Sequence, residues 1–472
     1  MRLFTSFMVA AAALLLAGCD RDNEGNGGPV GTVPANSPVV GFVHAVADAP
    51  SVNLRADGGT ILAGPFKTSS FGVVSPGDYS IDAVVSVPGM DDPVEVVAPT
   101  PVSVSNGDVV TVVAIGTAAA VTPIVIQEER PNVALTSTRV RIIHGSPAAP
   151  TVDVYVEAPG TDIATASPAA TLAFGDQTMP LTIPSGEYQV TITVAGNPAA
   201  VAYDSGTIDF FGGDDVVVVA VNNTVPGAAA VSLVMAGENR SAIDYLDTNT
   251  PASVRVIHAS PDAPNVDVLA GDPGAAIITN LAYTEESMTL EVDPGETRIQ
   301  VTATGTVTPA VIDETLTLAQ GFEYTVLATG LAGVADTEDN AIGALVLVDD
   351  NRAIATEARV RIIHAAATAG EVDIFVVEPG TDIAAPDMDG EDVAPAFAGV
   401  ELNDTTGYVS LEPGSYDVIV IAAEDEDSMA ADRMPVIGPA TITVAAGGVY
   451  SAAARDAAGG GAPFGLILFD DF

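Results

Sequence analysis

The sequence predicts an all-β protein with four tandem immunoglobulin-like, antiparallel β-sandwich domains that follow a signal peptide and a flexible tether. Three observations support this prediction. A motif that contains a histidine recurs at nearly even spacing. The segments between its copies are short, rich in Val and Thr, and alternate apolar with polar residues. The N-terminus combines a short apolar run with the only Cys of the chain.

The N-terminus has the pattern of a bacterial lipoprotein signal. Arg2 gives it a positive charge, and the apolar run Leu3–Leu16 is too short to span a bilayer comfortably. The run leads into Leu-Ala-Gly-Cys, which resembles a lipobox, and the resemblance implies cleavage before Cys19 and its lipidation. We therefore expect residues 1–19 to be a signal peptide and residues 20–37, rich in Gly, Asn, Asp and Pro, to be a flexible tether. The protein would be exported and anchored through its lipid in the inner or outer membrane of a bacterial cell envelope.

The histidine motif marks four copies of one module. Copies two and three, Val140–Val154 and Val254–Val268, match closely. Copy four, Val360–Ile374, has lost both prolines, and copy one, Val40–Leu54, is the most divergent. The histidines are 100, 114 and 106 residues apart, which is the length of a small domain. They are His44, His144, His258 and His364.

A second signature, Pro and Gly followed closely by Tyr or, in copy three, by Thr297, occurs later in each copy and is typical of a turn. After it, residues such as Tyr188, Val190 and Ile192 alternate with polar ones, as on one face of a strand. Several short strands in each copy favour a β-sandwich. The predicted domains are repeat 1 (38–132), repeat 2 (138–246), repeat 3 (252–353) and repeat 4 (357–472).

Composition excludes some functions. The chain has 62 acidic and 15 basic residues and a formal net charge of −47, whereas nucleic-acid binding needs a basic face. Hydrophobic residues make up 48% of the chain, which is enough for packed cores. A single Cys rules out an intrachain disulfide.

An Arg and an Asp accompany the histidine in three of the four copies. If the turn after the histidine leads directly into a paired strand, Arg141 lies opposite Asp153 and forms a cross-strand ion pair. Repeat 1 has lost both partners, with Gly41 and Asn53 in their places, as a mutual contact would predict. A ligand-binding Arg is the alternative. The other predicted pairs are Arg255 with Asp267 and Arg361 with Asp373.

The histidines occupy equivalent positions, at the end of a strand and before a turn. We expect structural histidines that are hydrogen-bonded to turn carbonyls. One alternative is a metal ligand, although no second His lies nearby in the sequence. The other alternative is a general base, with Ser146 or Ser260 two residues after the histidine as the nucleophile.

Acidic loops in repeat 4 are weak calcium candidates. Asp387, Asp389 and Asp392 concentrate the oxygen ligands that Ca²⁺ prefers, and residues 424–427 form a second acidic run. Neither has the spacing of an EF-hand loop, and solvated loops are the usual form of such runs. We expect no cofactor, with Ca²⁺ as the alternative.

The motif at Val254–Val268, followed by an aliphatic strand and the Pro-Gly signature, resembles the DUF4397 family. The resemblance covers nearly all of residues 38–472 and is most specific in repeats 2 and 3. It implies a secreted or lipid-anchored bacterial protein with tandem domains, and it brings no catalytic residues. We therefore expect a non-enzymatic, lipid-anchored stalk that interacts with an envelope polysaccharide or protein. The alternative is a hydrolase or metal site built on the His of repeat 2 or 3.

Overall fold

The computed structural model describes residues 36–272, 274–335, 337–385, 392–424, 430 and 433–470. Residues 35–472 belong to one compact unit, and its described residues contain strands and turns but no α-helix. A search of these residues for a helix long and apolar enough to span a membrane found none. The predicted signal peptide, Cys19 and most of the tether lie outside the described residues.

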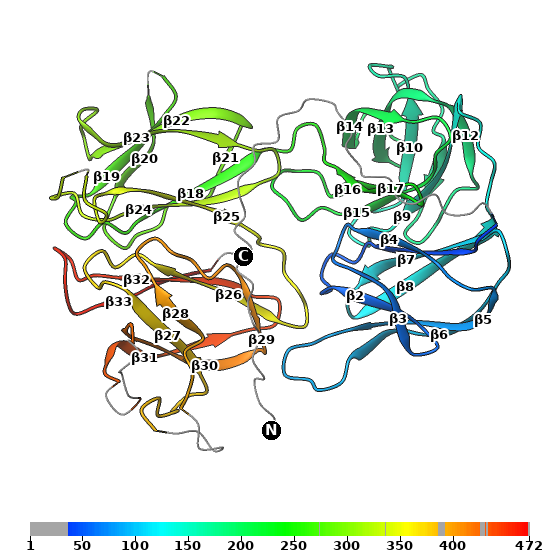
Figure 1. Cartoon of the computed structure of the whole chain (residues 1–472). Coiled ribbons are helices and arrows are strands. Elements are labelled where there is room, and N and C mark those ends of the chain that lie inside the picture. Colours follow the sequence, from blue (N-terminus) through cyan, green and yellow to red (C-terminus); the bar gives the residue numbers. More distant parts are fainter. Residues whose placement is uncertain are drawn as a thin grey trace. The chain divides into compact units, whose positions relative to one another are not determined.

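Each repeat contains two sheets, which Figure 1 shows as two layers. One sheet includes the strand that ends in the motif histidine and is called the His sheet below. The other includes the strand that follows the histidine turn and is called the second sheet. All strands of a given sheet come from the same repeat. The predicted all-β sandwich fold is thus confirmed.

In repeat 1 the His sheet has the order β4-β1-β7-β8 and the second sheet β3-β2-β5-β6. The strands are β1 (Val39–His44), β2 (Val52–Ala56), β3 (Gly59–Gly64), β4 (Ser69–Val73), β5 (Gly77–Val85), β6 (Val94–Val104), β7 (Asp108–Thr117) and β8 (Ala120–Glu129).

Repeat 2 has the same plan with one more strand in the His sheet, whose order is β12-β9-β15-β16-β17; the second sheet is β11-β10-β13-β14. The strands are β9 (Ser137–His144), β10 (Val152–Glu157), β11 (Ala170–Leu172), β12 (Leu181–Pro184), β13 (Gly186–Val194), β14 (Val201–Phe210), β15 (Asp215–Asn222), β16 (Val231–Gly237) and β17 (Arg240–Tyr245).

Repeat 3 has a His sheet ordered β21-β18-β24-β25 and a second sheet ordered β20-β19-β22-β23. The strands are β18 (Ala252–His258), β19 (Val266–Ala270), β20 (Ala275–Leu281), β21 (Leu290–Val292), β22 (Gly295–Ala303), β23 (Ala310–Leu318), β24 (Glu323–Thr329) and β25 (Gly343–Asp349).

Repeat 4 again has four strands in each sheet, in the orders β29-β26-β32-β33 and β28-β27-β30-β31. The strands are β26 (Ala358–His364), β27 (Val372–Val377), β28 (Phe397–Val400), β29 (Val409–Leu411), β30 (Gly414–Ala422), β31 (Pro435–Val444), β32 (Val449–Arg455) and β33 (Gly465–Asp470).

The sequence predicts antiparallel pairing, and all but one of the strand pairs in each repeat follow it. The exception is the strand that ends in the histidine, which runs parallel to a later strand of the His sheet. In repeat 1, β1 and β7 are parallel, with His44 opposite Ala114. Parallel strands need a long crossover, and here the chain builds the whole second sheet between them.

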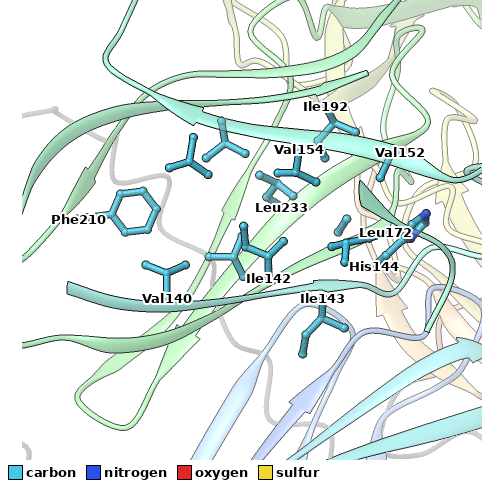
Figure 2. Close-up of a pocket in the computed structure, with 14 residues that line it drawn as sticks. Val140, Ile142, Ile143, His144, Val152, Val154, Leu172, Ile192, Phe210 and Leu233 are labelled. Carbon is cyan, nitrogen blue, oxygen red and sulfur yellow. The ribbon is translucent and has the colours of Figure 1, made fainter. Parts of the chain in front are cut away.

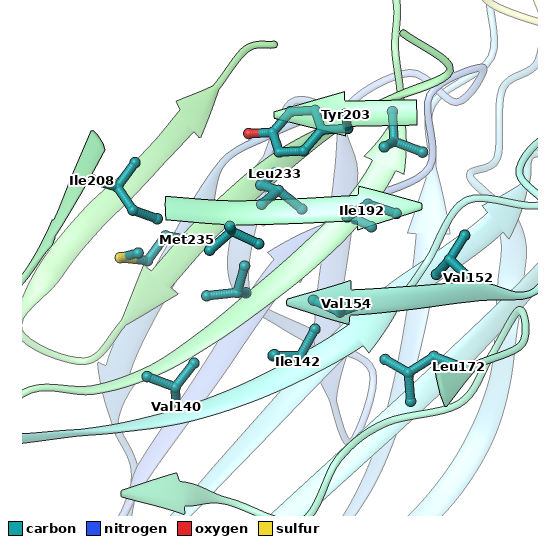
Figure 3. Close-up of a cluster of buried hydrophobic side chains, with 14 of the residues drawn as sticks. Val140, Ile142, Val152, Val154, Leu172, Ile192, Tyr203, Ile208, Leu233 and Met235 are labelled. Carbon is teal, nitrogen blue, oxygen red and sulfur yellow. The ribbon is translucent and has the colours of Figure 1, made fainter. Parts of the chain in front are cut away.

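The core of each repeat lies between its two sheets. In repeat 2, Val140 and Ile142 of β9 face Val154 of β10 and Ile192 of β13, and all four are buried (Figure 3). Tyr203 is also fully buried, and its hydroxyl donates to the carbonyl oxygen of Tyr245 at 2.8 Å. The bond matters because a buried hydroxyl without a partner destabilises the fold.

The other face of the His sheet is buried too, against the neighbouring repeat. Val43 of β1 and Ile143 of β9 are fully buried in one hydrophobic cluster that draws on repeats 1 and 2. Ile257 of β18 and Ile363 of β26 occupy the same place in a cluster that draws on repeats 3 and 4. The His sheets of repeats 1 and 2 therefore pack on each other, as do those of repeats 3 and 4.

The Tyr of the Pro-Gly signature fixes the chain where it enters the second sheet. The hydroxyl of Tyr79 donates to the carbonyl oxygen of Ser75 at 2.7 Å. Tyr188 and Tyr416 bond in the same way to the residue four positions earlier, at 3.0 and 2.8 Å. Repeat 3 has Thr297 at this position, whose side chain is too short for the same bond.

Replacing Thr297 by Tyr should therefore stabilise repeat 3, by about 0.5–1.5 kcal/mol for one added hydrogen bond. The matched control is Thr297→Phe, which adds the ring without the hydroxyl. Hydrogen exchange of the β22 amides measures the difference. Equal protection in the Tyr and Phe variants would show that the hydroxyl makes no useful bond there.

Candidate functional site

Each histidine lies at the end of its strand, where the chain leaves the His sheet for the second sheet. The ring of His44 is fully buried, and its Nε2 lies 2.9 Å from the carbonyl oxygen of Pro50. The backbone N–H of Val46 donates to Nδ1 at 3.2 Å. Because Nδ1 accepts a hydrogen bond, the ring is neutral and its proton is on Nε2, which donates to the carbonyl. One side chain thus ties both ends of the turn together.

This arrangement, called the histidine clamp below, recurs in the other repeats, except that Nδ1 of His144 has no hydrogen-bond partner among the described residues. Nε2 of His144, His258 and His364 lies 2.9, 3.0 and 2.7 Å from the carbonyl oxygen six residues later. In repeat 4 that carbonyl belongs to Gly370, where the other repeats have a proline. The substitution keeps the clamp because the acceptor is a backbone group. The predicted hydrogen bond to a turn carbonyl is therefore present in all four repeats.

Burial keeps the rings of His44 and His258 neutral. It lowers the pKa of His44 to about 4, although the bond to Pro50 acts in the opposite direction, and the positive charge of Arg352 lowers the pKa further. Burial also lowers the pKa of His258. At neutral pH a proton on these rings is unfavourable, as the clamp requires.

The serines two residues after the histidine do not form a catalytic pair with it. The hydroxyl of Ser146 donates to Oδ1 of Asn222. In repeat 3 the backbone N–H of Ser260, rather than its hydroxyl, contacts the ring, at 3.4 Å. Within the described residues, a search for three or more His, Cys, Asp or Glu side chains placed to hold a metal found none.

A small cavity lies beside His144, within the core of repeat 2. Its volume is about 10 Å³, and Figure 2 shows His144 at one end of a lining that is otherwise apolar, with Val140, Ile142, Val154 and Phe210 among its residues. This volume is at the lower limit for one water molecule, and an apolar lining offers a water few partners. The cavity is a packing gap in the core rather than a ligand pocket.

The predicted ion pair between Arg141 and Asp153 is wrong, as are Arg255 with Asp267 and Arg361 with Asp373. The turn after the histidine carries the chain from one sheet to the other, so β9 and β10 are not paired. In repeat 2 the partners of β10 are β11 and β13. Each Arg and Asp has other partners.

The aspartates accept hydrogen bonds from backbone N–H groups of the second sheet, an arrangement called the Asp staple below. In repeat 3, Asp267 accepts from the backbone N–H of Asn280 at 2.7 Å and of Gly305 at 2.9 Å. These bonds, that from Gly305 foremost, lower the pKa of the Asp267 carboxyl. Asp373 accepts in the same way from Gly399 and Glu424, at 2.8 and 3.0 Å. The carboxylate joins the chain segments on either side of its strand, and the pairing with β20 or β28 is irregular at this residue.

In repeat 2, the Asp153 carboxylate accepts one backbone hydrogen bond, from the N–H of Gly196 at 2.7 Å, and a second hydrogen bond from the hydroxyl of Thr171. The staple is therefore common to the three repeats that carry the Asp.

The arginines point out of their own repeat. Arg141 lies 3.5 Å from Glu128 of repeat 1, and Arg139 of the same strand donates to that carboxylate at 2.9 Å. In the other pair, Arg361 lies 2.7 Å from Asp349 of repeat 3. Arg255 donates to the carbonyl oxygen of Asp470 in repeat 4, at 3.1 Å. These arginines connect neighbouring repeats.

The loss of the Arg in repeat 1 has a steric reason. A Cβ atom on Gly41 would lie 2.2 Å from the ring of Phe71, which occupies this position. Sequence reasoning missed the acidic partners Glu128 and Asp349, although each lies at the end of an apolar strand, just before a further acidic residue. An acidic residue that recurs at the end of a strand was therefore the sequence signal that could have identified these partners.

The calcium candidates are only partly described. Asp387 and Asp389 lie outside the described residues, while Asp392 is described and exposed. Of the second acidic run, Glu424 is described and forms an ion pair with Arg433 at 2.9 Å.

The histidine clamp makes the stability of repeat 1 dependent on pH. The unfolded chain binds a proton near pH 6.5, whereas folded His44 does so only near pH 4. The unfolded state therefore binds more protons between these values. The contribution of neutral His44 is complete above pH 6.5 and falls by about 3 kcal/mol as the pH approaches 4.

Comparing wild type with His44→Gln isolates this effect, since the titration of the carboxyl groups is common to both proteins. Their difference in free energy of unfolding, measured with urea at several pH values, should shrink as the pH falls. A constant difference would mean that His44 has the same pKa in the folded and unfolded states, so that burial does not disfavour its protonation.

Three comparisons relate the chain to known proteins. A family model described as "Domain of unknown function (DUF4397)" matches residues 38–155, 140–245 and 252–375, which together make up more than half of the chain. A search of curated proteins found no match.

Among solved structures, the Bacillus anthracis TIE protein is similar at 10% sequence identity with a TM-score of 0.15, over 86% of this chain and 65% of that chain. A Streptococcal ancillary pilin is similar at 7% identity with a TM-score of 0.13, over 65% of this chain and 95% of that chain. Scores this low carry no argument, so the assignment depends on the family match and on the recurring fold. On these grounds the chain belongs to the DUF4397 family, of which it carries tandem domains.

Proposed function

We propose that the protein is a non-enzymatic, lipid-anchored protein of the bacterial cell envelope, in which the four β-sandwiches form a stalk for interaction with or adhesion to an envelope polymer or protein. The observation that carries this proposal is the histidine clamp. The histidine, which is placed equivalently in all four repeats, is used in each of them to hold a turn.

The chemistry of the clamp argues for a scaffold. A general base needs a nitrogen lone pair directed at its substrate. In repeat 3, Nδ1 of His258 accepts from the backbone and Nε2 donates to it, so neither nitrogen is directed at a substrate. The Asp267 carboxylate is likewise occupied by two backbone N–H groups. The repeated polar residues thus serve the fold and leave partner recognition to the variable loops.

The charge of the chain suggests the chemistry of the partner. With 62 acidic and 15 basic residues, the surface attracts cationic groups and repels nucleic acid or other polyanions. An envelope polymer that carries amino groups, or a basic protein face, fits this surface.

The lipid anchor can be tested directly. Cys19→Ser should move the protein from the membrane fraction to the soluble fraction, because lipidation needs the thiol. Asp20→Asn, which keeps Cys19, is the matched control and should stay with the membranes. Immunoblots of separated cell fractions measure both variants. A Cys19→Ser protein that still sediments with the membranes would contradict the anchor.

Replacing His258 distinguishes the scaffold from the hydrolase or metal site. For a scaffold, His258→Gln should lower stability by about 1–3 kcal/mol, because it leaves a buried carbonyl without its donor. Ser260→Ala, at a hydroxyl that is buried without a partner, should not lower it. Thermal melting, hydrolysis of p-nitrophenyl acetate and calorimetry with Zn²⁺ are measured for each variant. Unchanged melting together with lost hydrolysis or zinc binding would favour the alternative.

A further inference from the structure

The outer face of each His sheet has the composition of a core. The residue just before each histidine points away from the core of its own repeat, yet it is fully buried in all four repeats. Such a face on a free-standing sandwich would expose a broad apolar patch to water. The residues are Val43, Ile143, Ile257 and Ile363.

The two clusters that cover these faces are built alike. In the first, Val43 of β1 and Val113 of β7 meet their equivalents in repeat 2, Ile143 of β9 and Val219 of β15. In the second, Ile257 of β18 and Leu327 of β24 meet β26 and β32 of repeat 4 in the same way. The same strands are used on both sides, as in the self-complementary interface of a symmetric dimer.

Ion pairs reinforce the first interface at its edges. Lys67 of repeat 1 lies 2.8 Å from Asp244 of repeat 2. Arg130 lies 3.0 Å from Glu238 across the same boundary. Their partly buried positions make these pairs better ordered than free surface pairs.

The second interface has polar contacts of its own. The hydroxyl of Tyr283 in repeat 3 donates to the carbonyl oxygen of Asp456 in repeat 4 at 2.7 Å, and Arg361 pairs with Asp349. The ring of Phe469 in repeat 4 lies under the guanidinium of Arg255, 4.9 Å from its centre. Both interfaces thus combine an apolar centre with a polar rim.

Contacts between the two halves of the chain are of another kind. Among the hydrophobic clusters of the described residues, none combines repeats 1 and 2 with repeats 3 and 4. Polar contacts join them instead: Arg352 of repeat 3 donates to the carbonyl oxygens of Ala47 and Ala49 in repeat 1, at 3.0 and 2.9 Å, and lies over the ring of Phe66.

We propose that the repeats are obligate pairs, 1 with 2 and 3 with 4, and that each pair unfolds as one cooperative unit. Unfolding of one repeat would expose the outer face of its partner's His sheet to water. Neither sandwich is therefore stable without the other. This inference deepens the proposed function. It rests on that function in one respect only: within the stalk, the pair rather than the single sandwich is the element that bears load.

Neighbouring residues on one strand provide the test. Ile467 of β33 lies in the second interface and is 7% exposed, whereas the adjacent Leu468 is 60% exposed. In the full chain, Ile467→Asp should lower one of two calorimetric transitions by roughly 5–10 °C and leave the other in place. Hydrogen exchange should quicken in repeats 3 and 4 together, and not in β1–β17. Leu468→Asp is the matched control and should change neither measurement.

The first interface offers an equivalent comparison, with Ile124→Asp on β8 and its more exposed neighbour Val125→Asp as the control. If Ile467→Asp prevents folding, the milder Ile467→Ala is measured in the same way. Faster exchange confined to repeat 4, or spread over all four repeats, would overturn the pairing. Because exchange reports folding alone, a failure of the anchor or of binding to a partner would leave this result unaffected.

Discussion

Burial of the His sheet on both faces is the constraint on which the rest of the structure depends. One face closes the core of its own repeat and the other covers the neighbouring repeat. The parallel pair within this sheet fits that environment, since sheets with parallel strands are usually covered on both sides. The run Val216–Val221 on β15, apolar at six consecutive positions, is the local sequence that such a strand requires.

The backbone polar groups at the end of a strand that is buried on both faces have no water to bond to. This explains why a histidine that bonds to them lies there. The turn after the strand is buried at its beginning, so its backbone groups need partners within the protein. One neutral imidazole supplies both a donor and an acceptor in a small volume. His44 shows the cost of this solution, because burial disfavours the charged ring strongly enough to lower its pKa to about 4. The clamp is therefore suited to neutral pH.

Sequence reasoning predicted the repeats, the sandwich fold and the bond from each histidine to a turn carbonyl, because each depends on local pattern. It failed for Arg141 and Asp153 because it assumed that the turn led into a paired strand. A chain that crosses to the opposite sheet has the same local pattern as a hairpin, and alternation alone does not distinguish them. The two residues lie in different sheets, so their joint absence from repeat 1 reports no mutual contact: Phe71 fills the place of the Arg, and nothing in the structure explains the loss of the Asp.

The pairing of repeats escaped prediction for a related reason, although Val216–Val221 carried the signal. Six successive apolar residues are typical of a strand buried on both faces, whereas the prediction was based on strands that alternate apolar with polar residues. The ion pairs at the same boundary depend on residues far apart in the sequence, such as Lys67 and Asp244, and only the fold brings them together.

The distribution of charge bears on what holds each pair together. Acidic residues outnumber basic ones by 62 to 15, so the repeats carry like net charge, and their mutual repulsion opposes contact. Basic residues such as Arg139 and Arg361 lie where they offset this repulsion, at the boundaries between repeats. Salt weakens these pairs, but it also screens the longer-range repulsion among the far more numerous carboxylates. The apolar centre of the interface does not depend on charge, and salts that strengthen hydrophobic burial reinforce it. The balance of these effects favours tighter pairing as ionic strength rises, the opposite of an interface held mainly by ion pairs.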